Sequence, residues 1–296
     1  MPGTCAGYVE LVKNRKMTDN NSPWKYSDFI GEFIGTFILV FFGCGAVAVT
    51  VLFASHNGLF QIAAVWGIGV ALAIYATRHI SCAHLNPAVS VAMVVAKRMS
   101  GRKLPTYLAG QFCGAFLAAS VVYALFSNSI INFEVLHGIT RGDPESIATA
   151  MIFGEFYPNP GGVNIASVTM FNAFCAEAIG TFALVFFIFS LTEGCNVGRP
   201  DDNLAPLFIG SAVALIIAIM APLTQAGLNP ARDLSPRFFA FLAGWHQAAL
   251  PDERYGFLVV YGMGPVCGAI LAALLFRKII EPIMLRKNGE AGCNCS

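Results

Sequence analysis

The feature that most constrains this chain is a run of 45 residues, from Phe33 to Thr77, that contains no Asp, Glu, Lys or Arg. A helix needs about 20 apolar residues to cross the hydrocarbon core of a bilayer, so this run is long enough for two crossings. Charged side chains make up only 12% of the 296 residues, against roughly 25% in soluble domains. So few charges cannot cover a core in a chain that is 56% hydrophobic, and the sequence predicts a multi-pass integral membrane protein.

Six apolar stretches are long enough to be membrane-spanning helices, and two are not. The shorter pieces, Pro87–Ala96 and Pro230–Ala243, are too short to cross a bilayer and too apolar for ordinary loops. We therefore expect them to be half-spans that enter the membrane and turn back. The six predicted spans are Phe29–Val51, Phe60–Thr77, Leu104–Phe126, Val168–Leu191, Ala205–Ala221 and Tyr255–Phe276.

Basic residues gather on one side of these spans. Of the 18 Lys and Arg side chains, 14 lie before the first span, between the second and third, between the fourth and fifth, or after the sixth. The positive-inside rule therefore predicts that both termini are cytosolic, and we expect the plasma membrane as the location. The net charge of +1 offers no basic surface for nucleic acid.

Most cysteines stand singly inside apolar segments, where the thiol behaves as a small packing group. Examples are Cys44, Cys113, Cys175 and Cys267. We therefore expect no structural disulfide. Near the end of the chain, Cys293 and Cys295 leave lipidation open.

The two halves of the sequence repeat each other. Each half contains, in the same order, a Glu-x-Ile-Gly-Thr-Phe string that starts at Glu32 or Glu177, an Asn-Pro-Ala triplet, and a Cys-Gly-Ala-x-Leu-Ala-Ala string that starts at Cys113 or Cys267. Each half has three spans, and this odd number inserts the second half upside down relative to the first. We expect an all-α membrane fold of six transmembrane helices and two re-entrant half-helices in an inverted repeat.

The repeat also sets the expected domain boundaries. The membrane-embedded part of the chain would cover residues 29–278, with a first repeat at about 29–127, an extracellular connection at 128–167 and a second repeat at about 168–278. Residues 1–28 and 279–296 would be cytosolic tails. Inverted repeats of this kind place functional sites near the midplane of the bilayer.

Both half-spans begin with the same triplet, which occurs as Asn86-Pro87-Ala88 and as Asn229-Pro230-Ala231. Proline in the first turn of a helix costs no hydrogen bond, and the preceding Asn is a preferred N-cap, so each triplet starts a half-helix. In an inverted repeat the two half-helices meet N-terminus to N-terminus near mid-membrane. Their positive dipole ends repel cations there, whereas Asn86 and Asn229 can bind a neutral hydroxyl.

The longer strings around these triplets, HLNPAV at 84–89 and LNPARD at 228–233, closely resemble the major intrinsic proteins, the aquaporin and aquaglyceroporin family. The resemblance covers roughly Asp28 to Lys278. It implies a passive channel, not an enzyme, that assembles as a homotetramer in the lipid bilayer with one pore per protomer. The sequence itself shows no nucleophile–base or metal-ligand constellation, and we expect no catalytic residue, metal or cofactor.

The resemblance also assigns roles to single residues. Glu32 and Glu177, which are costly inside apolar spans unless they are hydrogen-bonded, would support the two re-entrant loops. His84 would line the cytosolic vestibule, where pH gating is a hypothesis. The selectivity filter would consist of Trp66, Ile217, Ala226 and Arg232.

Arg232 is the only charged residue between Asn203 and Asp233. Its fixed fork of donors can hold two adjacent hydroxyls of a solute, and its charge opposes cations. By the same resemblance, Trp66 would offer a flat apolar wall to the CH backbone of a polyol.

The resemblance favours the aquaglyceroporin branch. Asp233 followed by Arg237 is the pattern of that branch, and an acid–base pair at this spacing also stabilises a helix. Against this, Ile217 and Ala226 depart from the bacterial glycerol facilitators, and an aromatic at Tyr261 leans toward water channels. We expect passage of glycerol and other small neutral solutes with water, and urea is left open. The alternatives are a chiefly water-selective channel or, less favoured, a non-conducting adhesion or signalling member.

Overall fold

The computed structural model describes residues 26–161, 167–250 and 255–290. The tail expected at 1–28 lies almost wholly outside these residues, as do Cys293 and Cys295. Within the described chain the secondary structure is helical, and six helices are long and apolar enough to cross a membrane.

The transmembrane helices divide equally between the two repeats. The first repeat contains α2 (Ser27–Phe53), α3 (Leu59–Ser81) and α5 (Leu104–Leu136). The second contains α7 (Met170–Thr192), α8 (Ala205–Thr224) and a sixth helix. This sixth helix begins with a π-helical segment, η5 (Leu258–Met263), and continues as α10 (Gly264–Leu275). Each repeat adds one half-helix, α4 (Pro87–Val95) in the first and α9 (Pro230–Ala240) in the second. The predicted fold class, six spans with two re-entrant half-helices in an inverted repeat, is confirmed.

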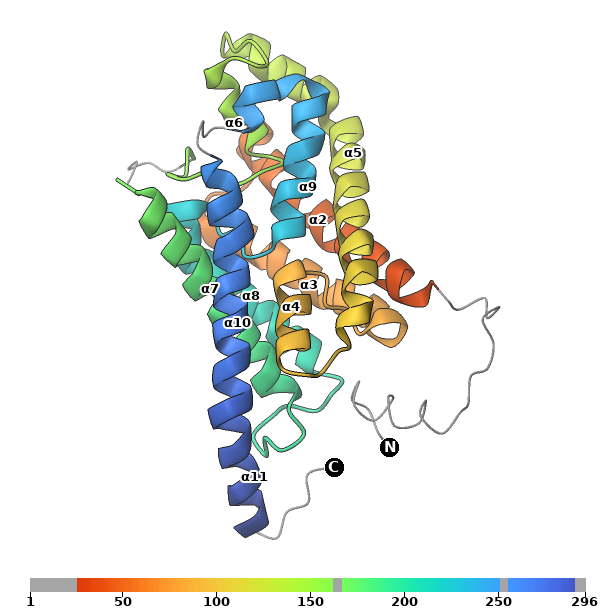
Figure 1. The fold of residues 1–296 in the computed structure, drawn as a ribbon. Helices are drawn as coiled ribbons and strands as arrows, with labels where there is room; N and C mark the ends of the chain where they lie inside the picture. Colours follow the sequence, from red (N-terminus) through yellow and green to blue (C-terminus); the bar gives the residue numbers. More distant parts are fainter. Residues whose placement is uncertain (1–25, 162–166, 251–254, 291–296) are drawn as a thin grey trace.

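Shorter elements connect and extend these helices. They are η1 (Gly101–Lys103), η2 (Pro144–Ser146), α6 (Ile147–Ala150), η3 (Phe241–Trp245), η4 (His246–Ala249), η6 (Phe276–Ile280) and α11 (Glu281–Glu290). We call the end of the bundle where α2 begins the tail face, and the end where α5 finishes the loop face (Figure 1).

Glycines let the helices of each repeat approach closely. A Cβ at Gly114 of α5 would overlap the Phe33 carbonyl of α2, and a Cβ at Gly268 of α10 would overlap the Ala178 carbonyl of α7. These two contacts are equivalent under the repeat, and only glycine permits such backbone contact. The sequence repeat is therefore also a repeat of helix packing.

The half-helices start at their Asn-Pro pairs and run in opposite directions. Asn86 is the N-cap of α4, and its side-chain oxygen accepts from the Ala88 N–H (2.8 Å). Asn229 caps α9 in the same way and accepts from the Ala231 N–H (3.1 Å). In Figure 1, α9 occupies the half of the bundle toward the loop face and α4 the half toward the tail face. Their capped N-termini therefore point at each other in the middle of the molecule.

The third span is longer than the sequence predicts, because α5 continues from Phe126 to Leu136. The polar residues after Phe126 indicate a loop, but one of them, Glu134, is buried and paired. Its carboxylate forms an ion pair with Arg141 (2.8 Å) and accepts from the Thr149 hydroxyl (2.8 Å). These bonds offset the cost of burying the acid and let the helix continue.

The last helix also continues beyond its predicted end. From α10 the chain passes through η6 into α11, so residues 279–290, expected as part of a tail, are helical. Arg277 fixes the start of this extension by donating to the Val95 carbonyl at the end of α4 (3.1 Å). In Figure 1, α11 extends the line of α10 past the tail face.

Cysteines inside and outside the spans behave differently. The four that lie singly in apolar helices, Cys44, Cys113, Cys175 and Cys267, are free. The expectation of no disulfide is nevertheless wrong, because Cys82 and Cys195 are disulfide-bonded. Both lie just beyond the end of a transmembrane helix, where the argument from burial in an apolar span does not apply.

Candidate functional site

Two short loops, 82–86 and 225–229, lead from a transmembrane helix into a half-helix. Three non-glycine residues in each loop have a left-handed backbone, and a residue held in this region costs about 1–3 kcal/mol. These residues are Cys82, Ala83 and Leu85 in the first loop and Gln225, Ala226 and Leu228 in the second. Such a conformation persists only where the surroundings hold it, so both loops need support from other parts of the chain.

Glu32 supplies this support to the first loop. Its carboxylate, fully buried in α2, accepts hydrogen bonds from the backbone N–H groups of His84 (2.9 Å) and Leu85 (2.7 Å). It also accepts from the Ser81 hydroxyl (2.8 Å) and the Gln111 amide (2.7 Å). Four donors around one carboxylate satisfy the buried acid and fix the path of the loop backbone.

Glu177 does the same for the second loop. Its carboxylate accepts from the N–H groups of Gly227 (2.9 Å) and Leu228 (2.6 Å), and from the Thr224 hydroxyl (2.7 Å). The donor positions correspond to those around Glu32, one hydroxyl at the end of a helix and two backbone N–H groups in the loop. Each repeat therefore holds its own loop with its own acid.

The two loops are also bonded to each other through their Asn side chains. The Asn86 amide donates to the Leu228 carbonyl (2.9 Å), and the Asn229 amide donates to the Leu85 carbonyl (2.7 Å). A side-chain amide carries two hydrogens. One hydrogen of each Asn joins the two loops, which leaves the second hydrogen for another acceptor.

The four residues expected to form a filter lie on four different segments, and the structure shows a contact between two of them. Trp66 lies on α3, Ile217 on α8, Ala226 in the second loop and Arg232 on α9, and all four are buried. The Arg232 guanidinium stacks on the Trp66 ring, with its central carbon 4.0 Å from the ring centroid. Gly43 of α2 makes room for this ring, because a Cβ there would overlap it. The arrangement sets a row of N–H donors beside a flat apolar surface.

Sequence reasoning missed one charged residue at this place, Glu155. It belongs to the connection between the repeats, is only 3% exposed, and forms an ion pair with the guanidinium of Arg232. Burial raises the pKa of Glu155 to about 7, although the adjacent Arg232 acts in the opposite direction. A signal was present, because Glu155 is the only charged residue from Ser146 to Ala176, and an acid in such a stretch needs a partner.

The pair that marks the aquaglyceroporin pattern, Asp233 and Arg237, lies next to Glu155. The two side chains form a buried ion pair within α9 (2.8 Å). Asp233 accepts from the backbone N–H of Glu155 (2.7 Å), and Arg237 donates to the backbone carbonyl of the same residue. A further bond joins Arg237 to the Ala249 carbonyl (2.8 Å). The pair thus binds both backbone polar groups of Glu155.

His84 lies at the tail-face side of the first loop. Its ring is 4.7 Å from that of Tyr107, and its Nδ1 lies 3.2 Å from the Ser90 hydroxyl oxygen. Burial lowers the pKa of His84 to about 3, and the nearby Lys103 acts in the same direction. The imidazole therefore stays neutral throughout the range in which histidine gates usually work.

We accordingly expect His84 not to act as a pH gate. Because the lowered pKa keeps the ring neutral, the permeability of an His84→Asn variant should depend on pH between about pH 5 and about pH 8 in the same way as that of the natural chain. Stopped-flow light scattering on proteoliposomes at several pH values would measure this. A pH dependence that is present in the natural chain and absent from the variant would contradict it.

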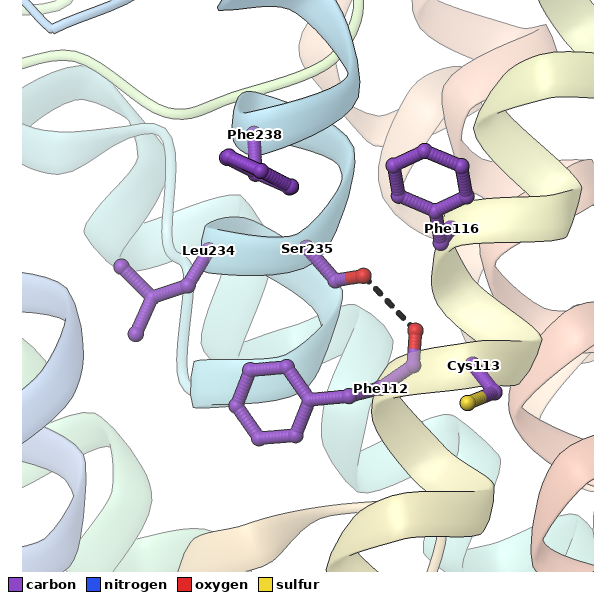
Figure 2. A pocket seen from close by; sticks show the side chains of 6 residues that line it. All are labelled: Phe112, Cys113, Phe116, Leu234, Ser235 and Phe238. Atoms are coloured by element: carbon purple, nitrogen blue, oxygen red, sulfur yellow. Dashed lines mark hydrogen bonds between the residues drawn. The ribbon is translucent and has the colours of Figure 1, made fainter.

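An apolar groove on the outer surface of the bundle shares no residue with this site. It lies between α5 and α9, where the Ser235 hydroxyl donates to the Phe112 carbonyl (2.7 Å) and large rings flank the opening (Figure 2). Its lining is Phe112, Cys113, Phe116, Leu234, Ser235 and Phe238. The polar groups at the half-helix junction and around Arg232 are therefore the candidate functional site.

Comparisons of the sequence and of the structure with known proteins all match this chain to one family. The model of the family described as major intrinsic protein matches residues 19–276. A glycerol uptake facilitator protein of Haemophilus influenzae is 43% identical over 90% of this chain and 96% of its own length, and that of Escherichia coli K12 is 42% identical over 85% and 87%. A propanediol uptake facilitator of Citrobacter freundii is 37% identical over 85% of this chain and 91% of its own. The X-ray structure of the aquaglyceroporin from Plasmodium falciparum superposes with a TM-score of 0.76 at 27% identity, covering 88% of this chain and all of that one.

Proposed function

This chain belongs to the major intrinsic protein family, and on that premise we propose that it is a passive channel for glycerol and other small neutral solutes, with water. The observation that carries the proposal is the stacking of Arg232 on Trp66 at 4.0 Å. A polyol has hydroxyls along one edge and CH groups along the other. A donor row beside an apolar ring suits such a molecule better than it suits an ion or a wholly apolar solute.

Exclusion of cations and protons would follow from the junction of the half-helices. The N-termini of α4 and α9 bring two positive dipole ends to one place, and Arg232 adds a positive charge beyond them. Asn86 and Asn229 each keep one amide hydrogen for a solute oxygen, so a water or polyol passing the junction donates its own hydrogens elsewhere. No bond is made or broken in the solute.

The breadth of the filter is a second part of the proposal. We infer that the small side chain of Ala226 leaves space at one wall of the filter and that Ile217, on α8, reduces the space at another. Tyr261, whose aromatic ring leans toward water channels, lies behind the second loop and donates to the Thr224 carbonyl (3.1 Å). Because this bond makes Tyr261 a support of the second loop, we give it less weight than the filter residues when we infer the solute. We therefore favour a channel for glycerol over a channel for water alone.

We further propose a homotetramer in the plasma membrane, with one pore per protomer and both termini in the cytosol. The family resemblance supports the assembly. The excess of Lys and Arg on the tail-face side of the spans supports the orientation.

Glycerol entry into proteoliposomes tests the proposal. Vesicles with the purified protein, placed in a glycerol gradient, should shrink and then re-swell at least about tenfold faster than protein-free vesicles. The channel would lower the barrier to glycerol entry by more than about 1.4 kcal/mol relative to the lipid bilayer. A gradient of an impermeant sugar on the same vesicles measures water alone. Fast shrinkage without re-swelling would identify a water-selective channel, and the absence of both would identify a non-conducting member.

A further inference from the structure

The apolar groove between α5 and α9, which we call the outer groove, lies apart from the filter. Its volume is about 480 Å³, and all of its lining comes from these two helices (Figure 2). The only hydroxyl in the lining, that of Ser235, is used within the protein, because it donates to the Phe112 carbonyl (2.7 Å). The outer groove therefore presents an apolar surface to its surroundings.

The depth of the outer groove in the bilayer follows from the geometry of α9. This half-helix starts after Asn229, at the junction that an inverted repeat places near the midplane of the bilayer. Ser235 and Phe238 come six and nine residues later, which corresponds to about 9 Å and about 13 Å along the helix. Half of the hydrocarbon core is about 15 Å thick. The outer groove thus lies among the lipid tails of the leaflet at the loop face.

The rim of the outer groove on the side of α9 is an open apolar stripe. Leu234, Phe238 and Leu242 follow one another at intervals of four residues, so they share one face of the helix. Phe238 and Leu242 are 56% and 59% exposed. On α5, Cys113 is exposed as well. The described part of the chain leaves this face open at a depth where only lipid or another protein can cover it.

The shape of the outer groove favours a lipid chain over a protein partner. Toward the loop face its two rims come together, because the ring centroids of Phe116 and Phe238 are 6.3 Å apart. A helix with its side chains is about 10–12 Å wide, so a helix of a second copy would bridge the rims and leave the groove beneath it empty. An acyl chain is one methylene thick and bends to the shape of the surface. Of the two occupants, lipid is the one that fills the groove.

The corresponding place in the first repeat is covered by the protein. Val95 stands nine residues after Asn86, as Phe238 does after the second Asn. Val95 packs against the buried cluster that contains Phe276 of the sixth helix. Phe238 instead remains exposed. The need for an occupant from outside the chain is therefore particular to the second half-helix.

We propose that the outer groove binds one lipid acyl chain from the leaflet at the loop face. Lipid tails are as apolar as the groove, so the chain is held by van der Waals contact with a concave surface instead of by the hydrophobic effect. The bound chain packs against Leu234 and Phe238 and so supports, from outside, the half-helix that carries Arg232. The inference does not depend on which solute the pore passes.

A tryptophan reporter in the outer groove tests the proposal. Phe238→Trp places an indole at the rim, and Leu117→Trp is the matched control. Leu117 is exposed on α5 next to Phe116, and so at the same depth, but it does not line the groove. Each full-length variant is depleted of native lipid in detergent, which phosphate analysis verifies. It then enters vesicles of dioleoyl phosphatidylcholine that contain increasing fractions of the same lipid brominated at its double bonds.

Bromine quenches an indole that it contacts, so the course of the quenching counts the chains beside each reporter. The natural chain, with its three tryptophans, supplies the background emission. With one chain in the groove, the Phe238→Trp indole should lose about half of its emission when half of the lipid is brominated, because a single site is occupied in proportion to supply. The Leu117→Trp indole, which several exchanging chains surround, should lose about three quarters or more at the same fraction.

Two results would overturn the inference. Equal and steep quenching of both reporters would show ordinary contact with the surrounding lipid only. An unquenched indole in Phe238→Trp would show that protein, such as a second copy of this chain, covers the groove. Should Phe238→Trp not fold, Phe116→Trp on the opposite rim is read in the same way. Because the readout is fluorescence, a failure of this inference leaves the measured permeabilities, and thus the proposed function, untouched.

Discussion

Arg232→Ala is expected to open the filter to small cations and to larger polyols. The substitution removes the positive charge and most of the side chain at the filter, and it leaves the buried carboxylate of Glu155 without its partner. Burial raises the pKa of Glu155 to about 7 even beside Arg232, so without Arg232 this acid is largely protonated at neutral pH. Where the natural filter presents a positive charge to the pore, the variant would present none.

Methylammonium uptake and the entry of a larger polyol, both relative to glycerol, measure this change in proteoliposomes. We expect each to rise at least about tenfold in Arg232→Ala, which corresponds to a barrier lower by about 1.4 kcal/mol. The double variant Arg232→Ala with Glu155→Gln should admit the larger polyol and should take up cations as Arg232→Ala does at neutral pH, because position 155 is uncharged in both. Arg102→Ala, an exposed arginine between α4 and α5, is the control. If Arg232→Ala excluded cations as well as the natural chain does, Arg232 would not carry the charge barrier.

Glu177→Gln is expected to reduce the amount of folded protein severely while the protein that folds keeps its selectivity. The carboxylate accepts from two backbone N–H groups and one hydroxyl, at 2.6–2.9 Å. The amide of Gln turns an NH₂ group toward donors that need an acceptor. Each buried N–H left without an acceptor costs about 1–3 kcal/mol. Losses of this size are large against a total stability of about 5–15 kcal/mol.

The yield of monodisperse protein after size-exclusion chromatography and its thermal unfolding midpoint measure the effect. Glu32→Gln should behave in the same way, because Glu32 has the equivalent place in the first repeat. Glu145→Gln serves as the control, since its side chain is exposed. A normal yield of Glu177→Gln together with an altered glycerol-to-water ratio would show that this acid belongs to the filter instead of supporting the loop.

Much of the fold is predictable because its causes are local. A charge-free run of sufficient length specifies a span, and an Asn followed by Pro specifies the start of a half-helix. The pairing of Asp233 with Arg237 is also local, because residues four apart lie on one face of a helix. The sequence repeat adds the inverted arrangement, since three spans per half leave no other way to insert the second copy.

The ends of the helices were harder to predict, because the cause lies elsewhere in the chain. Polar residues after Phe126 indicate a loop, yet α5 runs on to Leu136. The helix tolerates Glu134 there only because Arg141 and Thr149 fold back onto it. No pattern within the helix itself contains that information.

The sequence by itself determined the spans, the half-helices and their caps, and the residues around the pore are a prediction from the family resemblance. Only the tertiary structure decided that the carboxylate of Glu155 forms an ion pair with the guanidinium of Arg232. The same holds for the bonds from Asp233 and Arg237 to the backbone N–H and carbonyl of Glu155. The physical reason is the range of the interactions. Periodicity and capping act over a few residues, whereas a contact between residues 77 positions apart depends on the path of a connecting segment, and that path is set by packing against every helix it crosses.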